Sequence, residues 1–195
     1  MVADGGSDMI LIPIINWSFQ QFRVTPVQQW ADFHRIPRQR STEARLRAAL
    51  DLYPCDVLFV HRDAESQTSD LRRREIAHTL LRISVPHVSV VPVRMTEAWL
   101  LADEGAIRSA AGNPNGREDL HLPDFRRLEE LPDPKRILHE ALATASGLGA
   151  RRRSRLPVHR RVHLIPNYID DYSRLNALSA FQALQQDIRA LIERA

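Results

Sequence analysis

The sequence predicts an α/β protein whose mostly parallel sheet is flanked by helices and followed by a mostly helical C-terminal lobe. Residues 56–60 (DVLFV) and 87–93 (HVSVVPV) are short apolar runs without alternation, which is typical of strands covered on both faces. A helical pattern follows each run, over residues 70–83 and 96–111. Because strands and helices alternate along the chain, we expect βαβ units and a parallel sheet.

Two more helices are indicated nearer the N-terminus. The apolar segment 9–22 follows a glycine turn, with Ser7 at the N-cap position and Pro13 disturbing or delaying the start of the helix. Residues 41–53 carry apolar side chains on one helical face and end at Pro54. Both segments are therefore predicted to be helical.

The second half of the chain changes character. Residues 113–132 are rich in Pro, Gly, Asn and acidic residues, which is typical of turns and loops. Helices are expected to follow over residues 134–146 and 173–195. We therefore divide the chain into an α/β domain of residues 1–112 and a helical C-terminal extension of residues 113–195 packed on it.

Composition argues against a membrane protein and against a disulfide-stabilised one. The 195 residues are 44% apolar and 26% charged, as in ordinary globular proteins. The longest apolar run covers only residues 9–15, and the acidic N-terminus lacks the features of a signal peptide. The single cysteine, Cys55, cannot form an internal disulfide. We expect a cytoplasmic protein with no membrane partner.

The basic residues are almost all arginine. The formal net charge is +3, and Lys135 is the one lysine in the sequence. A GC-rich coding genome would explain this bias. Arginine also suits phosphate, because its planar guanidinium group binds phosphate oxygens bidentately. Composition leaves both explanations open.

The strongest local signal for chemistry follows the first predicted strand. In extended chain, Asp63 and Glu65 point to the same side, and His61 falls there too. Ligands of open α/β sheets bind beyond the carboxyl ends of the strands. Paired carboxylates at such an edge suit Mg²⁺ or Mn²⁺. The alternatives are a solvated loop for the two acids and a histidine held by a backbone partner.

Two further acids are candidates for the same cluster. Asp4 stands beside a Gly-Gly turn that precedes a helix start, although this segment would also fit a frayed terminus. Glu97 follows Thr96 at the end of the second predicted strand, close to the expected position of Asp63. Thr96 and Glu97 would equally suit the first turn of a helix for electrostatic reasons alone.

A basic stretch over residues 151–163 is the candidate nucleic-acid contact. It could guide a polyanionic substrate, or it could be a solvated loop or a docking segment for a partner protein. It lacks interleaved aromatic residues, so base stacking is not indicated. Its arginines are Arg151, Arg152, Arg153, Arg155, Arg160 and Arg161. The sequence contains no P-loop, GxGxxG, HExxH or GxSxG motif.

Four segments together carry a resemblance to a known family: DGGSD (4–8), DAE (63–65), RMTEAWLLAD (94–103) and LPDPK (131–135). They resemble an uncharacterised bacterial family, domain of unknown function 4276, and the likeness covers nearly the whole chain. That family is similar to Toprim-like domains, the metal-binding α/β module of topoisomerases, primases and several phage-defence nucleases. The resemblance implies a Toprim/Rossmann-like fold.

The resemblance also implies roles for individual acids. Asp4 falls where the module has a glutamate, and Asp63 and Glu65 fall on its Asp-x-Asp pair, which binds Mg²⁺. Asp replaces Glu at position 4 and Glu replaces Asp at position 65, so the reach of both carboxylates differs from the pattern. We predict Asp63, Glu65 and Asp4 as metal ligands, with Asp4 as an alternative acid/base and Glu97 completing the catalytic set.

The predicted function is Mg²⁺-dependent (or Mn²⁺-dependent) phosphoryl transfer by a nuclease in phage defence or nucleic-acid processing. The rival is a non-catalytic Toprim-like binding or regulatory subunit of a larger complex that contains an ATPase. A phosphatase acting on a small phosphoester is a third reading, and it would not need the basic stretch. The resemblance is compatible with an ATPase partner protein, and the sequence is compatible with a homodimer.

Overall fold

The chain is mostly helical and contains a small two-stranded parallel sheet. We describe it from a computed structural model covering residues 1–3, 5–32 and 41–194. Helices account for 54% of the chain, so the predicted Toprim/Rossmann-like, mostly parallel sheet flanked by helices is wrong. The predicted site residue Asp4 lies outside the described residues.

The sheet is formed by strands β1 (Leu58–His61) and β2 (His87–Val90). The strands run parallel, with Leu58 opposite His87 and His61 opposite Val90. Helix α3 (Ser69–Leu80) connects them as a βαβ crossover. Among the described N-terminal residues, Val2 adds a single parallel bridge to Val60. The sheet stays small because the other apolar segments of the described chain carry the helical period.

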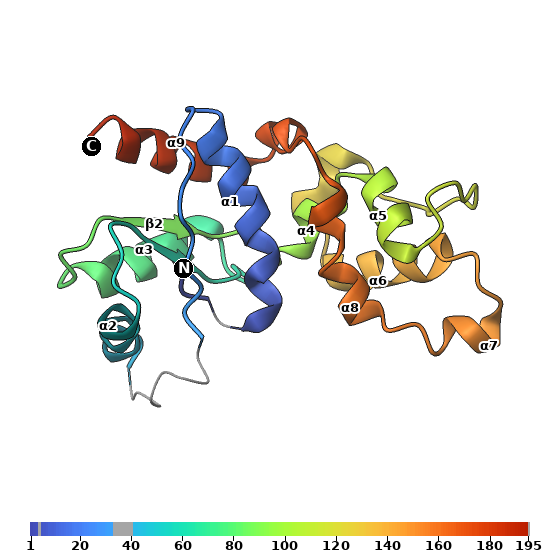
Figure 1. The fold of residues 1–195 in the computed structure, drawn as a ribbon, viewed down its shortest axis with the longest axis horizontal. Coiled ribbons are helices and arrows are strands. Elements are labelled where there is room, and N and C mark those ends of the chain that lie inside the picture. The colour runs from blue at the N-terminus through green and yellow to red at the C-terminus, as the bar shows by residue number, and fades with distance from the viewer. Residues whose placement is uncertain (4, 33–40, 195) are drawn as a thin grey trace.

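Helices cover both faces of this sheet (Figure 1). Phe59, Val88 and Val90 belong to the larger apolar core, whereas Leu58 and Val60 belong to a second, smaller one. Side chains alternate between the two faces along each strand, and both faces are buried. The lack of hydrophobic alternation in the sequence therefore predicted two-sided burial correctly.

The sheet is surrounded by η1 (Gly6–Ile10), α1 (Leu11–Gln20), α2 (Thr42–Leu52) and α9 (Ser179–Ile192). Pro13 lies in the first turn of α1, where proline is tolerated better than in the interior of a helix. Helix α9 returns from the C-terminal half to pack on β2 and α1. Its Gln185 amide donates to Ser18 Oγ at 2.6 Å.

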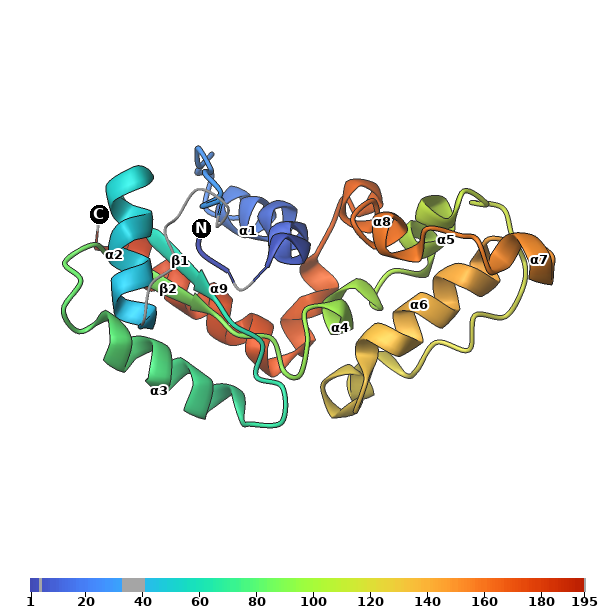
Figure 2. The same cartoon turned by 90° about the horizontal axis from the view of Figure 1, so that it is seen from below.

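The remaining helices form a second group that extends away from the sheet (Figure 2). Helix α6 begins at the predicted residue, Pro134, and has Asp133 as its N-cap. None of the described helices is long and apolar enough to cross a membrane. The members of this group are α4 (Glu97–Leu100), α5 (Glu104–Ala111), η2 (Phe125–Glu130), α6 (Pro134–Ala145), α7 (Ala150–Arg153), α8 (Val158–Val162), η3 (Ile165–Tyr168) and η4 (Ser173–Ala177).

Candidate acidic site at the ends of the strands

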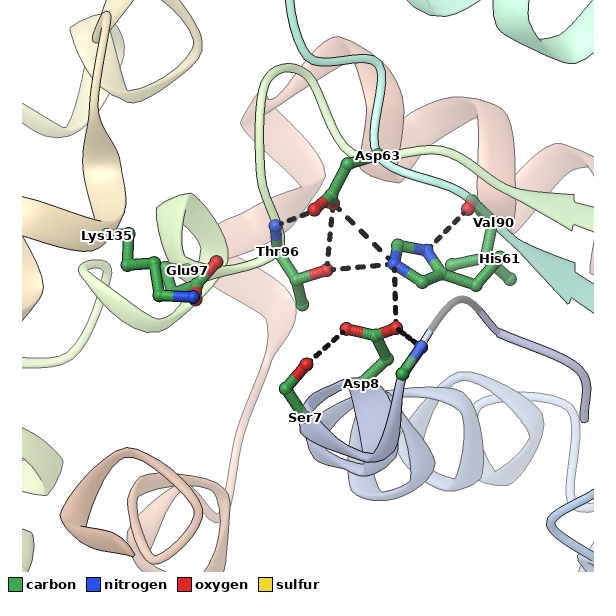
Figure 3. A network of polar contacts seen from close by, with 9 residues as sticks. Ser7, Asp8, His61, Asp63, Val90, Thr96, Glu97 and Lys135 are labelled. Atoms are coloured by element: carbon green, nitrogen blue, oxygen red, sulfur yellow. Dashed lines mark hydrogen bonds and ion pairs between the residues drawn. The ribbon is translucent and has the colours of Figure 1, made fainter. Parts of the chain in front are cut away.

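Asp63 and Asp8 lie on either side of His61 where the sheet meets the second group of helices, and Glu97 lies on the far side of Thr96, next to Lys135 (Figure 3). Asp63 follows β1, Glu97 opens α4 shortly after β2, and Asp8 lies in η1. The parallel pairing of β1 and β2 carries both strand ends to the same edge. The bridge from Val2 to Val60 brings the N-terminal segment beside them.

Asp63 is held by Thr96. The Thr96 backbone N–H donates to Asp63 Oδ1 at 3.1 Å, and the Thr96 hydroxyl lies 3.3 Å from the same oxygen. Thr96 is the N-cap residue of α4, yet its side chain makes no capping hydrogen bond with that helix. The alternative that Thr96 and Glu97 occupy the start of a helix is therefore confirmed in position, while the Thr96 hydroxyl donates to Asp63 and not to the helix.

His61 lies beneath the acids and is almost fully buried, with 2% of its surface exposed. Its Nδ1 is 2.9 Å from the Val90 carbonyl oxygen, so Nδ1 carries a hydrogen and donates it. The backbone partner predicted for His61 is thereby confirmed. The other nitrogen, Nε2, faces Thr96 Oγ1 at 3.4 Å, Asp63 Oδ1 at 3.6 Å and Asp8 Oδ2 at 3.8 Å.

Asp8 was not singled out from the sequence, although it belongs to this site. Its Oδ2 accepts the Gly5 N–H at 3.0 Å, and its Oδ1 accepts the Ser7 hydroxyl at 3.2 Å. The Asp8 side chain thus caps the start of η1 and places a negative charge near His61. Its sequence signal was an acid in the first turn of a helix, which capping alone would explain.

The electrostatics of the site centre on Asp63. The pKa of Asp63 is raised to about 6. Burial is the main cause, and the negative charges of Glu97 and Asp8 add to it, against the opposing effects of His61 and the Thr96 hydrogen bond. The side chain remains 30% exposed, so solvent and ligands can reach it. A carboxyl group in this setting is stabilised by taking up a proton or a cation.

Glu97 connects the acids to the second group of helices. Its side chain is only 12% exposed, and Oε1 lies 3.6 Å from Lys135 Nζ on α6. Its charge contributes to the raised pKa of Asp63. Lys135 therefore partly neutralises the acid that lies nearest the helical group.

The structure separates Glu65 from this cluster. Glu65 has φ of 53° and lies in an exposed turn, so the extended alternation that was expected to align it with Asp63 ends before it. Its backbone N–H donates to the Arg94 carbonyl oxygen at 3.0 Å. Arg94 is also left-handed, with φ of 65°. The expectation that Asp63 and Glu65 share one side of an extended segment is wrong.

The predicted arginines fall into two groups. Arg161 is partly buried and donates to the Ala110 carbonyl oxygen at 3.0 Å, near the end of α5. Arg153 is exposed and donates to the Leu148 carbonyl oxygen at 3.3 Å. Helix α7 lies at the end of the helical group away from the sheet (Figure 2). The others are Arg151, Arg152, Arg155 and Arg160, all of them exposed.

The donor atoms suit a hard cation without forming a complete cage. Within residues 1–3, 5–32 and 41–194, no three His, Cys, Asp or Glu side chains are arranged to hold a metal ion. Mg²⁺ does not require such a set, because it is commonly bound by one or two carboxylates together with waters and substrate phosphate. The carboxylates of Asp63 and Glu97 fit that mode, since the negative charge of Glu97 helps to raise the pKa of Asp63.

No protein-family model, curated protein or solved structure matches the chain. The resemblance to domain of unknown function 4276 therefore stays a prediction, and the acidic site is interpreted from its own geometry.

Proposed function

We propose that the protein carries out Mg²⁺-dependent phosphoryl transfer on nucleic acid, as a nuclease in phage defence or nucleic-acid processing. One observation carries this proposal: Asp63, Glu97 and Asp8 share one partly buried junction, where the pKa of Asp63 rises to about 6. A carboxyl group whose pKa is raised by burial and by neighbouring acids is typical of functional sites.

The proposal gives each side chain a distinct role. Asp63 and Glu97 would hold the ion, and bound Mg²⁺ would neutralise phosphate charge and activate a water molecule. Thr96 and His61 orient Asp63 through the contacts at its Oδ1. Asp8 adds negative charge, while its own oxygens are occupied by Gly5 and Ser7. The roles of Asp4 and Glu65 remain predictions.

Partners follow from the same proposal. The exposed arginines of residues 151–160 would contact the nucleic-acid backbone, and an ATPase partner would couple the nuclease to a larger system. A cytoplasmic location agrees with such substrates. Neutralising Arg151, Arg152 and Arg155 should weaken a nuclease and leave a small-molecule phosphatase nearly unchanged.

A non-catalytic binding subunit is the second candidate. It is favoured by the hydrogen bonds that already occupy Asp8 and Asp63 Oδ1 within the protein. The lack of a three-residue metal set in the described part of the chain favours it as well. In this case the acidic site would serve to join the sheet to the helical group.

Calorimetric titration with Mg²⁺ and Mn²⁺ separates the two candidates. We expect the wild-type protein to bind these ions with millimolar or tighter affinity. Asp63→Asn should lose this binding, although the asparagine side chain keeps the shape of the aspartate beside Thr96. Asp170→Asn, at an exposed position, is the matched control. DNA and RNA cleavage should fall by about a hundredfold or more in Asp63→Asn. Folded wild-type protein that binds neither ion would contradict the proposal.

A further inference from the structure

A row of basic side chains begins directly beside Glu97. Lys135 and His139 stand four residues apart on α6, so they lie on one face of that helix. His139 packs edge-to-face against His159 of α8, with 4.8 Å between the ring centroids. Lys135 Nζ is 3.6 Å from Glu97 Oε1, so the row leads from the acidic site toward α8.

The row leads to a stretch of the sequence with one sign of charge. Residues 141–169 contain six arginines and no Asp or Glu. Arg160 follows His159 directly, and both are exposed. Helix α7, with Arg151 to Arg153, lies beyond the far end of α6 (Figure 2).

Packing alone explains only part of this arrangement. The His139–His159 contact helps α6 pack on α8, and burial together with the nearby charges of His159 and Lys135 lowers the pKa of His139. However, His159 is exposed and the Lys135 side chain is 45% exposed, so both present N–H groups to solvent. The positive charges of Lys135 and Arg160 attract polyanions, whose phosphates these exposed N–H groups can bind.

We infer that Lys135, His139 and His159 form a phosphate-binding site that starts a polynucleotide track along α6 and α8 toward α7. This inference rests on the proposed function, because it assumes that phosphodiesters reach Glu97 and Asp63. Helix α6 has 12 residues, so it spans about 18 Å, or about five nucleotides of one strand. The track offers no aromatic row for stacking, so it binds the backbone regardless of base sequence.

Fluorescence anisotropy with labelled oligonucleotides of increasing length tests the track, in EDTA so that no cleavage occurs. Affinity should rise up to about five nucleotides and then level off. His159→Ala should lower it severalfold, and the double variant His139→Ala/His159→Ala by about tenfold. Lys135→Gln should reduce the slope of log affinity against log salt by about one. His87→Ala, an exposed histidine at the start of β2, should bind as the wild type does.

Each result bears on a different claim. Length-dependent binding that needs Lys135 and His159, without Mg²⁺-dependent cleavage, would support the track and contradict the nuclease proposal. Cleavage with unchanged binding in all three variants would overturn the track and leave the nuclease standing. The track would also be overturned if inorganic pyrophosphate competed as well as an oligonucleotide does, because a single small phosphate site would then explain the binding. His159→Ala keeps the test decisive if the double variant unfolds, since the His159 side chain is exposed.

Discussion

The acidic site and the arginine-rich surface use charge in opposite ways. At the acidic site, Asp8, His61, Asp63 and Thr96 face one another within hydrogen-bonding or ion-pairing distance, and most are buried. On the helical group, Arg151, Arg152, Arg155 and Arg160 are exposed and lie in a stretch without acids. The first arrangement depends on exact position, whereas the second depends mainly on the sum of charges.

The largest expected effect concerns Asp63 and the pH. Its folded-state pKa of about 6 lies above the ordinary value of 3.8, so the ionised form destabilises the folded protein above pH 6. Stability is gained as the pH falls from 7 to 4. We expect Asp63→Asn to raise the free energy of unfolding by about 1–2 kcal/mol at pH 8, allowing for solvent exposure.

Urea denaturation at pH 8 and pH 4 checks this expectation. The gain should vanish near pH 4, where Asp63 is protonated in most folded molecules and increasingly in unfolded ones. Asp170→Asn serves as the exposed control. A variant that is less stable than the wild type at pH 8 would show that the contacts of the Asp63 carboxylate outweigh its burial.

The next effect concerns the hydroxyl of Thr96. Thr96→Val keeps the shape of this buried residue and the backbone N–H donor, but it removes the hydroxyl at 3.3 Å from Asp63 Oδ1. We expect a loss of about 1–2 kcal/mol in unfolding free energy. The pKa of Asp63, followed by NMR, should rise, because a hydrogen bond to the ionised form is lost. Thr96→Ser, which keeps the donor, should leave that pKa near the wild-type value.

The smallest effect separates two neighbouring arginines. Arg161 donates to the Ala110 carbonyl oxygen, whereas Arg160 is exposed and makes no ion pair with any described acid. Arg161→Gln should therefore lower the unfolding free energy by about 1 kcal/mol, and Arg160→Gln by less than about 0.5 kcal/mol. Oligonucleotide affinity should show the opposite order. Equal effects of both variants on melting temperature and affinity would remove the distinction between structural and surface arginines.

Local patterns in the sequence predicted individual elements well. The two strands, the crossover helix α3 and the capped start of α6 all depend on neighbouring residues, such as Asp133 and Pro134 before and within the first turn. The predicted fold class was wrong because two strands with a helix between them do not determine how many more strands join the sheet. In the described chain, the N-terminal segment contributes only the Val2–Val60 bridge.

The candidate site was predicted only in part for the same reason. The sequence indicated Asp63 and Glu97, because each follows a strand and parallel strands end at one edge. It missed Asp8, Lys135 and His139, whose positions depend on how η1 and α6 pack beside that edge. It also aligned Glu65 with Asp63, since a left-handed turn at a glutamate has no clear sequence signal.

The sequence by itself determined the local elements, the two-sided burial of both strands and the single-sign charge of residues 141–169. Only the tertiary structure decided which acids meet, that Thr96 serves Asp63, and that a basic row starts at Glu97. The physical reason is range. Backbone propensity and periodicity act over a few residues. The contacts of the site join residues far apart in the chain: His61 and Val90 are 29 positions apart, and Glu97 and Lys135 are 38 positions apart.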